Sequence, residues 1–152
     1  MKIQKIELGE IRIPLVTPFR TALRTVTEVR DMVVRITADD GQAGYGEAPA
    51  TAVITGDTLG SIETAIRDFI APAILGMDIE DMDGIMHRMQ KAILKNTSAK
   101  AAVDMAVYDL YAKNLGKPLY KVLGGRSNSI ETDLNISVNE ESRMVEDALK
   151  GV

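Results

Sequence analysis

The fold is decided by residues 98–115, which read SAKAAVDMAVYDLYAKNL. Apolar residues recur there at the spacing that places them on one face of an α-helix. Most of them are alanine, and such small side chains let neighbouring elements pack closely. We therefore predict a central helix that ends at Gly116 and Pro118. Its apolar stripe consists of Ala99, Ala102, Val103, Ala106 and Leu110.

Two further helices are predicted before the central one. Residues 60–74 carry apolar side chains at helical spacing, and Pro72 is expected to break or kink the end of this helix. Residues 79–94 form the second helix, with methionine and isoleucine on one side. Its start is rich in aspartate and glutamate, which a helix N-terminus favours. His87, the only histidine, lies in this helix and is expected to be exposed.

An antiparallel meander of three strands is predicted to open the chain, over residues 2–14, 32–38 and 42–48. The middle strand has the clearest pattern, because apolar and polar residues alternate along it. Asp39-Asp40-Gly41 then supplies a hairpin turn. The side chains expected on the buried face of this strand are Met32, Val34, Ile36 and Ala38.

Residues 15–30 are predicted to be a connection much longer than an ordinary hairpin loop. Arg20, Arg24 and Arg30 lie along it. The planar guanidinium of an arginine can bind a carboxylate through two hydrogen bonds, which lysine cannot reproduce. Exposed arginines on a loop can equally be solvated and bind nothing, so the residues alone leave both interpretations open.

Gly124-Gly125 marks the clearest boundary in the chain, which divides it into residues 1–125 and residues 126–152. Beyond it, residues 130–138 alternate between apolar and polar side chains, which predicts a strand. Asn139 is expected to cap a final helix that continues to the end of the sequence.

Composition excludes several classes of function. The 152 residues carry a formal net charge of −4, so no basic excess favours nucleic acid. Cysteine is absent, which removes thiol nucleophiles and thiolate metal sites. Charged residues near the N-terminus interrupt any signal peptide, and no apolar run is long enough to cross a membrane. A cytoplasmic protein without membrane contact is expected.

Acidic residues offer no convincing site of their own. The cluster from Asp78 to Asp83 has isoleucine where a calcium loop begins with a carboxylate. Asp104 and Asp109 lie on the central helix, where structural hydrogen bonds or ion pairs are favoured over catalysis.

The order of motifs nevertheless resembles a known family. Residues 99–110, 112–113, 116–119 and 123–125 resemble the signature of the mandelate racemase and muconate lactonizing group of the enolase superfamily. This resemblance implies an α+β fold. An N-terminal capping domain, built from a three-stranded antiparallel meander and a helical bundle, is followed by the first strand of a truncated TIM-type barrel.

Within that group, residues 13–15, 18–24, 44–49 and 54–57 resemble the dipeptide epimerases, particularly the L-Ala-D/L-Glu epimerases. The resemblance implies that two loops of the capping domain close over the barrel mouth and select the substrate. Arg24 would bind the side-chain carboxylate of the glutamyl residue. Phe19, Ile54 and Thr55 belong to the specificity loops, and Asn135 stands where the family has a substrate-contacting threonine.

The chemistry implied by the resemblance is proton exchange at the α-carbon of a dipeptide. Relatives use Mg²⁺ held by carboxylates and a pair of lysines, all on later barrel strands. We therefore expect no catalytic residue and no metal ligand in this segment, which alone should be inactive. Its partners would be a small dipeptide and the missing barrel domain, in a homo-oligomeric isomerase that serves the recycling of cell-wall peptides.

Two alternatives remain open. The complete protein could be an N-acylamino acid racemase, an o-succinylbenzoate synthase or a muconate cycloisomerase of the same superfamily. The chain could also be a short, non-catalytic binding or oligomerisation module. A Lys-x-Lys sequence shortly after Val152 would favour the enzyme, and a stop codon would favour the module.

Overall fold

The computed structural model describes residues 1–151 and contains one three-stranded sheet, with strand order β1-β2-β3. β2 and β3 pair in antiparallel register, with Val34 opposite Gly46 and Ile36 opposite Gly44. The predicted meander is therefore confirmed. The strands are β1 (Ile3–Arg20), β2 (Thr25–Ala38) and β3 (Ala43–Pro49).

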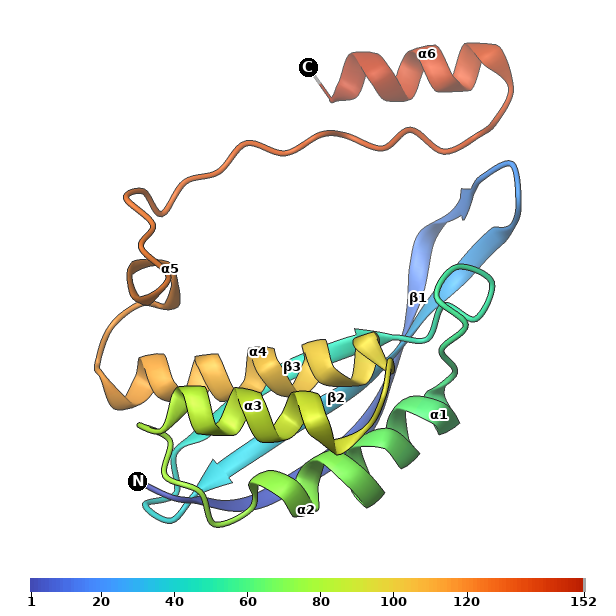
Figure 1. Cartoon of the computed structure of the whole chain (residues 1–152). Coiled ribbons are helices and arrows are strands. Elements are labelled where there is room, and N and C mark those ends of the chain that lie inside the picture. Colours follow the sequence, from blue (N-terminus) through green and yellow to red (C-terminus); the bar gives the residue numbers. More distant parts are fainter. Residues whose placement is uncertain (152) are drawn as a thin grey trace. The chain divides into compact units, whose positions relative to one another are not determined.

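Helices follow the sheet along the chain, and the central helix is confirmed as α4, which is the longest (Figure 1). All residues predicted for its apolar stripe are fully buried. The helical elements are α1 (Leu59–Thr64), η1 (Ala65–Ile70), α2 (Ala71–Ile74), α3 (Met82–Ala92), α4 (Thr97–Asn114), α5 (Leu119–Val122) and α6 (Glu141–Lys150).

The described chain forms two compact units. Unit 1 comprises Met1–Ile11 and Arg30–Arg126, and unit 2 comprises Arg12–Val29 and the described residues from Ser127 onward. No helix within residues 1–151 combines the length and the apolar character needed to cross a lipid bilayer.

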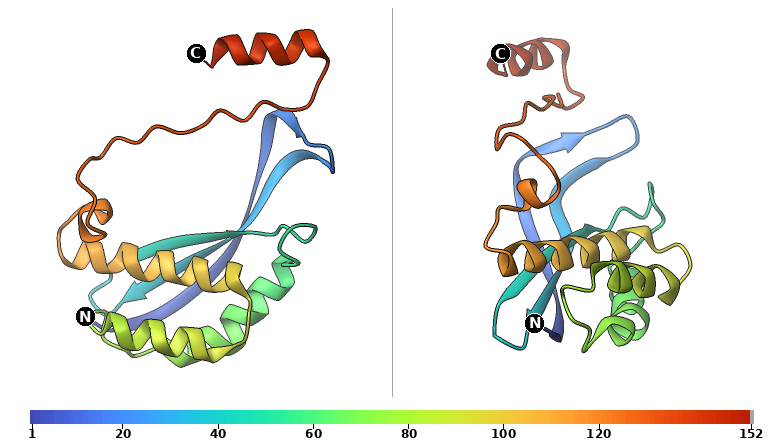
Figure 2. Two further views of the ribbon diagram at one scale, coloured as in Figure 1. Left: turned by 45° about the horizontal axis from the view of Figure 1, so that its top comes forward. Right: turned by 60° about the vertical axis from the view of Figure 1, so that its left-hand side comes forward.

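In unit 1, the helices cover one face of the sheet (Figure 2). The alternation in β2 explains which face is covered, because Val34, Ile36 and Ala38 are fully buried whereas Arg35 is exposed. Isoleucines of η1 and α2, including Ile66 and Ile74, complete the apolar core.

β3 and α4 pack backbone against backbone. A Cβ atom at Gly44 would overlap the carbonyl oxygen of Ala106, and one at Gly46 would overlap that of Ala102. Both glycines are therefore required by close approach, and the alanines of α4 allow it. This contact makes α4 a firmly held element of unit 1.

The helix expected at residues 60–74 forms, but Pro72 does not break it. α1, η1 and α2 follow one another without interruption, and Pro72 lies in the first turn of α2. η1 is a π-helical segment that ends at Ile70, two residues before Pro72, and the hydrogen-bonding register of the backbone changes there. The helical run therefore continues to Ile74.

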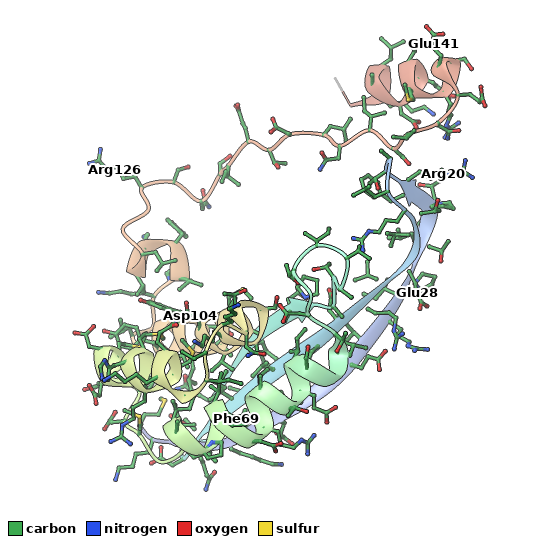
Figure 3. The ribbon with its side chains drawn as sticks, turned by 45° about the vertical axis from the view of Figure 1, so that its right-hand side comes forward. Arg20, Glu28, Phe69, Asp104, Arg126 and Glu141 are labelled. Atoms are coloured by element: carbon green, nitrogen blue, oxygen red, sulfur yellow. The ribbon has the colours of Figure 1, made fainter. Side chains whose placement is uncertain are left out.

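The long connection predicted for residues 15–30 is wrong. β1 continues to Arg20 and β2 begins at Thr25, so only a short turn separates two long strands. Figure 3 labels Arg20 at the end of β1 and Glu28 on β2. The prediction failed because these strand ends pair through their backbones without burying a face. They therefore lack the apolar alternation that marked the other strands.

The strand predicted over residues 130–138 is also not formed. These residues lie in no helix or strand, and Ile130 is 92% exposed. Alternation alone does not make a strand, because its backbone groups need a neighbouring strand for pairing. α6 follows as expected, but its N-cap residue is Glu140 instead of Asn139.

Candidate functional site

The turn at the end of the β1–β2 hairpin fixes the backbone of Arg24. The amide of Thr21 donates to the carbonyl oxygen of Arg24 at 2.9 Å. The hydroxyl of Thr21 in turn accepts from the amides of Leu23 and Arg24, at 3.2 Å each. Thr21 therefore fixes the backbone position from which the half-buried Arg24 side chain extends. Sequence reasoning did not assign this role to Thr21.

A cavity of about 260 Å³ lies within unit 2, and two residues predicted for the site line it. Phe19 comes from the end of β1 and Asn135 from the extended segment before α6. Arg24 is not among the lining residues. The complete lining is Thr17, Pro18, Phe19, Leu134, Asn135, Ile136, Ser137, Asn139, Arg143 and Asp147.

Hydrogen bonds hold the extended segment against the end of β1. The amide of Arg20 donates to the Ser137 hydroxyl at 2.7 Å, and the amide of Val138 donates to the carbonyl oxygen of Arg20 at 2.9 Å. These contacts bring Phe19 and Asn135 to the same cavity. Ser137 was missed by the sequence reasoning, because a serine at a polar position of an alternating stretch gives no signal of this contact.

The cavity also receives charged side chains from α6. Arg143 pairs with Glu146 at 3.1 Å and with Asp147 at 3.3 Å. The hydrogen bond from Lys150 to Glu146, at 2.6 Å, lowers the pKa of Glu146 below its usual value. These pairs are solvent-exposed and contribute little to stability.

The second predicted specificity loop belongs to unit 1 and connects β3 to α1. The amides of Ile54 and Thr55 both donate to the carbonyl oxygen of Thr51 at 2.9 Å. Ile54 is 68% exposed and its neighbour Val53 is 71% exposed. This turn presents apolar side chains to solvent, which is typical of a surface that meets a ligand or another segment.

The two aspartates of α4 have different surroundings. Asp109 accepts from the amide of Tyr45 at 2.9 Å and from Lys113 at 2.7 Å, as expected for a structural carboxylate. Asp104, labelled in Figure 3, has one carboxylate oxygen buried without a hydrogen-bond partner. Desolvation by burial raises the pKa of Asp104. The expectation of a hydrogen bond or ion pair therefore holds for Asp109 only.

The acidic cluster before α3 acts as a helix cap. Asp81 accepts from the amide of Gly84 at 3.1 Å and caps α3, as its sequence position indicated. His87 is exposed on the same helix. Within residues 1–151, no group of three or more histidine, cysteine, aspartate or glutamate side chains is placed to hold a metal ion. Magnesium therefore does not fit the described side chains, and we assign it no step in this segment.

An antiparallel sheet covered on one face by an alanine-rich central helix is the architecture of an enolase-superfamily N-terminal domain. Residues 5–124 match the family model described as mandelate racemase / muconate lactonizing enzyme, N-terminal domain. The chain belongs to this family.

Individual curated relatives show which members of this family the chain resembles in sequence. The L-Ala-D/L-Glu epimerase of Clostridium acetobutylicum is 49% identical over 152 residues, which is all of this chain and 42% of that protein. The Bacillus subtilis enzyme of the same name is 49% identical over 97% of this chain and 40% of its own length. The chain thus spans less than half the length of these relatives.

Solved structures agree with the sequence comparison. A substrate-liganded complex of the B. subtilis L-Ala-D/L-Glu epimerase superposes with a TM-score of 0.94, covering 99% of this chain and 42% of that one. A dipeptide epimerase from Enterococcus faecalis, complexed with Mg and the dipeptide L-Leu-L-Tyr, gives a TM-score of 0.92 at 33% identity. That match covers 99% of this chain and 42% of that one.

Proposed function

We propose that this chain is the substrate-specificity segment of a dipeptide epimerase that acts on L-Ala-D/L-Glu-type dipeptides. The supporting observation is the 49% identity to L-Ala-D/L-Glu epimerases, which extends over the whole chain. The complete protein would invert the α-carbon of the second residue by removing and returning one proton. Residues 1–125 would form the capping domain and residues 126–152 the start of the barrel.

Each predicted site residue has a role in this proposal. The guanidinium of Arg24 would bind the side-chain carboxylate of the substrate through two hydrogen bonds. Asn135 would donate or accept a hydrogen bond through its amide, and Phe19, Ile54 and Thr55 would exclude substrates of the wrong shape. The proton-transferring lysines and the Mg²⁺ ligands would lie beyond residue 152. We also propose a cytoplasmic, homo-oligomeric protein.

Exchange of the substrate α-proton in deuterated water tests this function directly. The full-length protein containing this chain is incubated with L-Ala-D-Glu, L-Ala-L-Glu, neutral dipeptides and N-succinyl amino acids. The last group is included because an N-succinyl-L-Arg/Lys racemase from Bacillus cereus is 31% identical over 97% of this chain. Fastest deuterium incorporation into the glutamyl dipeptides is expected. Incorporation confined to the N-succinyl compounds, or into none of them, would contradict the proposal.

Replacing Arg24 by methionine tests the proposed carboxylate contact. Loss of a charged hydrogen bond should raise KM for L-Ala-D-Glu by about 10-fold to 100-fold. A neutral dipeptide should change by less than about 3-fold, because it offers no side-chain carboxylate. Arg20→Met is the matched control, since this exposed arginine lies on the same hairpin. Equal effects of Arg24→Met on both substrates would remove Arg24 from the specificity role.

A further inference from the structure

A short hydrogen bond joins the second predicted specificity loop to the central helix. The hydroxyl of Ser98, in the first turn of α4, donates to the Asp57 carboxylate at 2.5 Å. The two residues are 41 positions apart in the sequence, and the bond is partly buried. Hydrogen bonds to an ionised carboxylate are stronger than those between neutral groups.

The start of α4 lacks the usual local capping. Its N-cap residue, Asn96, has a left-handed backbone with φ 49° and makes no capping hydrogen bond through its side chain. The first turn contains no acidic residue. Negative charge is favoured at this end of a helix. The carboxylate of Asp57, which lies outside α4, therefore supplies the negative charge that the first turn of α4 lacks.

Asp57 is bonded in turn to the rest of the loop. Its amide donates to the Thr55 hydroxyl at 3.3 Å, and this hydroxyl lies 3.1 Å from that of Thr51. The amide of Ala50 donates to the carbonyl oxygen of Arg30 on β2 at 3.5 Å. The loop is therefore connected to β2 at one end and to α4 at the other.

α4 can hold this loop in place because the helix packs directly on β3. The contacts of Gly44 and Gly46 leave no room for α4 to shift toward the sheet. Ser98 lies one turn before Ala102, which contacts Gly46. A displacement of Asp57 away from α4 therefore requires breaking its bond to Ser98.

We infer that Asp57 and Ser98 are positioning residues, which hold Ile54 and Thr55 where the substrate meets them. This inference rests on the proposed function, and neither residue is required to touch the substrate. A positioning role predicts weaker substrate binding when the bond is lost, with little change in the chemical step.

Ser98→Ala in the full-length protein tests the kinetic consequence. KM for the preferred dipeptide should rise about 5-fold to 10-fold while kcat changes by less than about 2-fold. Ser98→Thr, which retains a hydroxyl, should restore KM. Ser61→Ala is the matched control, because it removes a serine hydroxyl from the first turn of another helix, where the bonds reach only Thr58. A fall in kcat alone, or an unchanged KM, would overturn the inference.

Amide hydrogen exchange of the loop gives a readout that does not depend on activity. In Ser98→Ala, the amides of Ile54 and Thr55 should exchange about 5-fold faster or more, whereas Ser61→Ala should leave them unchanged. Unchanged exchange in Ser98→Ala would overturn the inference even if the enzyme is active. Accelerated exchange in a protein that epimerises no dipeptide would overturn the proposed function and leave the loop connection supported.

Discussion

The two compact units differ in whether they bury their apolar side chains. Every buried residue of the described chain lies in unit 1, from Ile3 to Ala112. Unit 2 is rich in apolar residues, but none of those described is buried. The large exposed ones in unit 2 are Ile13, Val16, Phe19, Leu23, Ile130, Leu134, Ile136, Val138, Val145 and Leu149.

The stable core lies in unit 1, whereas the proposed recognition residues are divided between the two units. Phe19, Arg24 and Asn135 belong to unit 2, and the loop with Ile54 and Thr55 belongs to unit 1. Unit 1 has its own core, and burial of that core is the main force that holds its sheet and helices together. Unit 2 leaves its apolar side chains available for contact with other groups, which suits a substrate or the remainder of the proposed barrel domain. The proposed specificity residues Phe19 and Arg24 therefore lie in the part of the chain that contributes least to its stability.

The largest contrast is expected from the same substitution made in both units. Leu110→Ala in α4 should lower the free energy of unfolding by about 2–5 kcal/mol, because it leaves a cavity in the core. Leu149→Ala in α6 should change it by less than about 0.5 kcal/mol, since Leu149 is 75% exposed. Urea denaturation of the 152-residue chain, followed by circular dichroism, measures both. Similar losses of unfolding free energy in the two variants would contradict the difference in burial between the two units.

A smaller effect is expected where β3 meets α4. Gly46→Ala places a methyl group against the backbone of Ala102 and should cost about 1–3 kcal/mol. Gly60→Ala is the matched control, because nothing lies near its added Cβ and alanine favours a helix more than glycine does. Thermal unfolding should show a lower Tm only for Gly46→Ala. An unchanged Tm there would contradict the close packing.

The smallest effect concerns the pH dependence of unit 1. Burial raises the pKa of Asp104, so the folded protein binds its proton more tightly than the unfolded chain does. Stability should therefore fall as pH rises from the ordinary aspartate pKa of about 3.9 through the raised value in the folded protein.

Asp104→Asn should remove this contribution and raise stability above that range by less than about 1 kcal/mol. Urea titrations at several pH values measure it, with Asp68→Asn, an exposed position, as the control. A loss of stability in Asp104→Asn at neutral pH would show that the ionised carboxylate stabilises the folded chain.

Sequence patterns predicted unit 1 well because its periodicities arise from burial. The alternation from Met32 to Ala38 and the stripe from Ala99 to Leu110 both report which side faces the core. The π-helical turn before Pro72 could not be predicted, because it depends on local backbone register and leaves no apolar signal. The cap at Asp81 was predictable, since a single nearby residue provides it.

Unit 2 was predicted less well for the converse reason. Residues 15–20 form a strand without burying a face, and residues 130–138 alternate without a strand to pair with. The alternation of apolar and polar residues therefore fails to predict strands where the chain has no buried core. Contacts between distant residues, such as Ser98 with Asp57 or Ser137 with Arg20, leave no mark in a single sequence.

Amide hydrogen exchange along residues 1–151 tests the contrast between the units most directly. Amides of β3, α4 and residues 30–38 of β2 should be strongly protected and exchange only on global unfolding. Those of residues 127–151 should exchange much faster through local opening, because few contacts beyond the bonds within α6 hold them. Equal protection in the two units would mean that unit 2 possesses a stabilising core of its own, which would contradict the difference between a unit 1 with a buried core and a unit 2 without one.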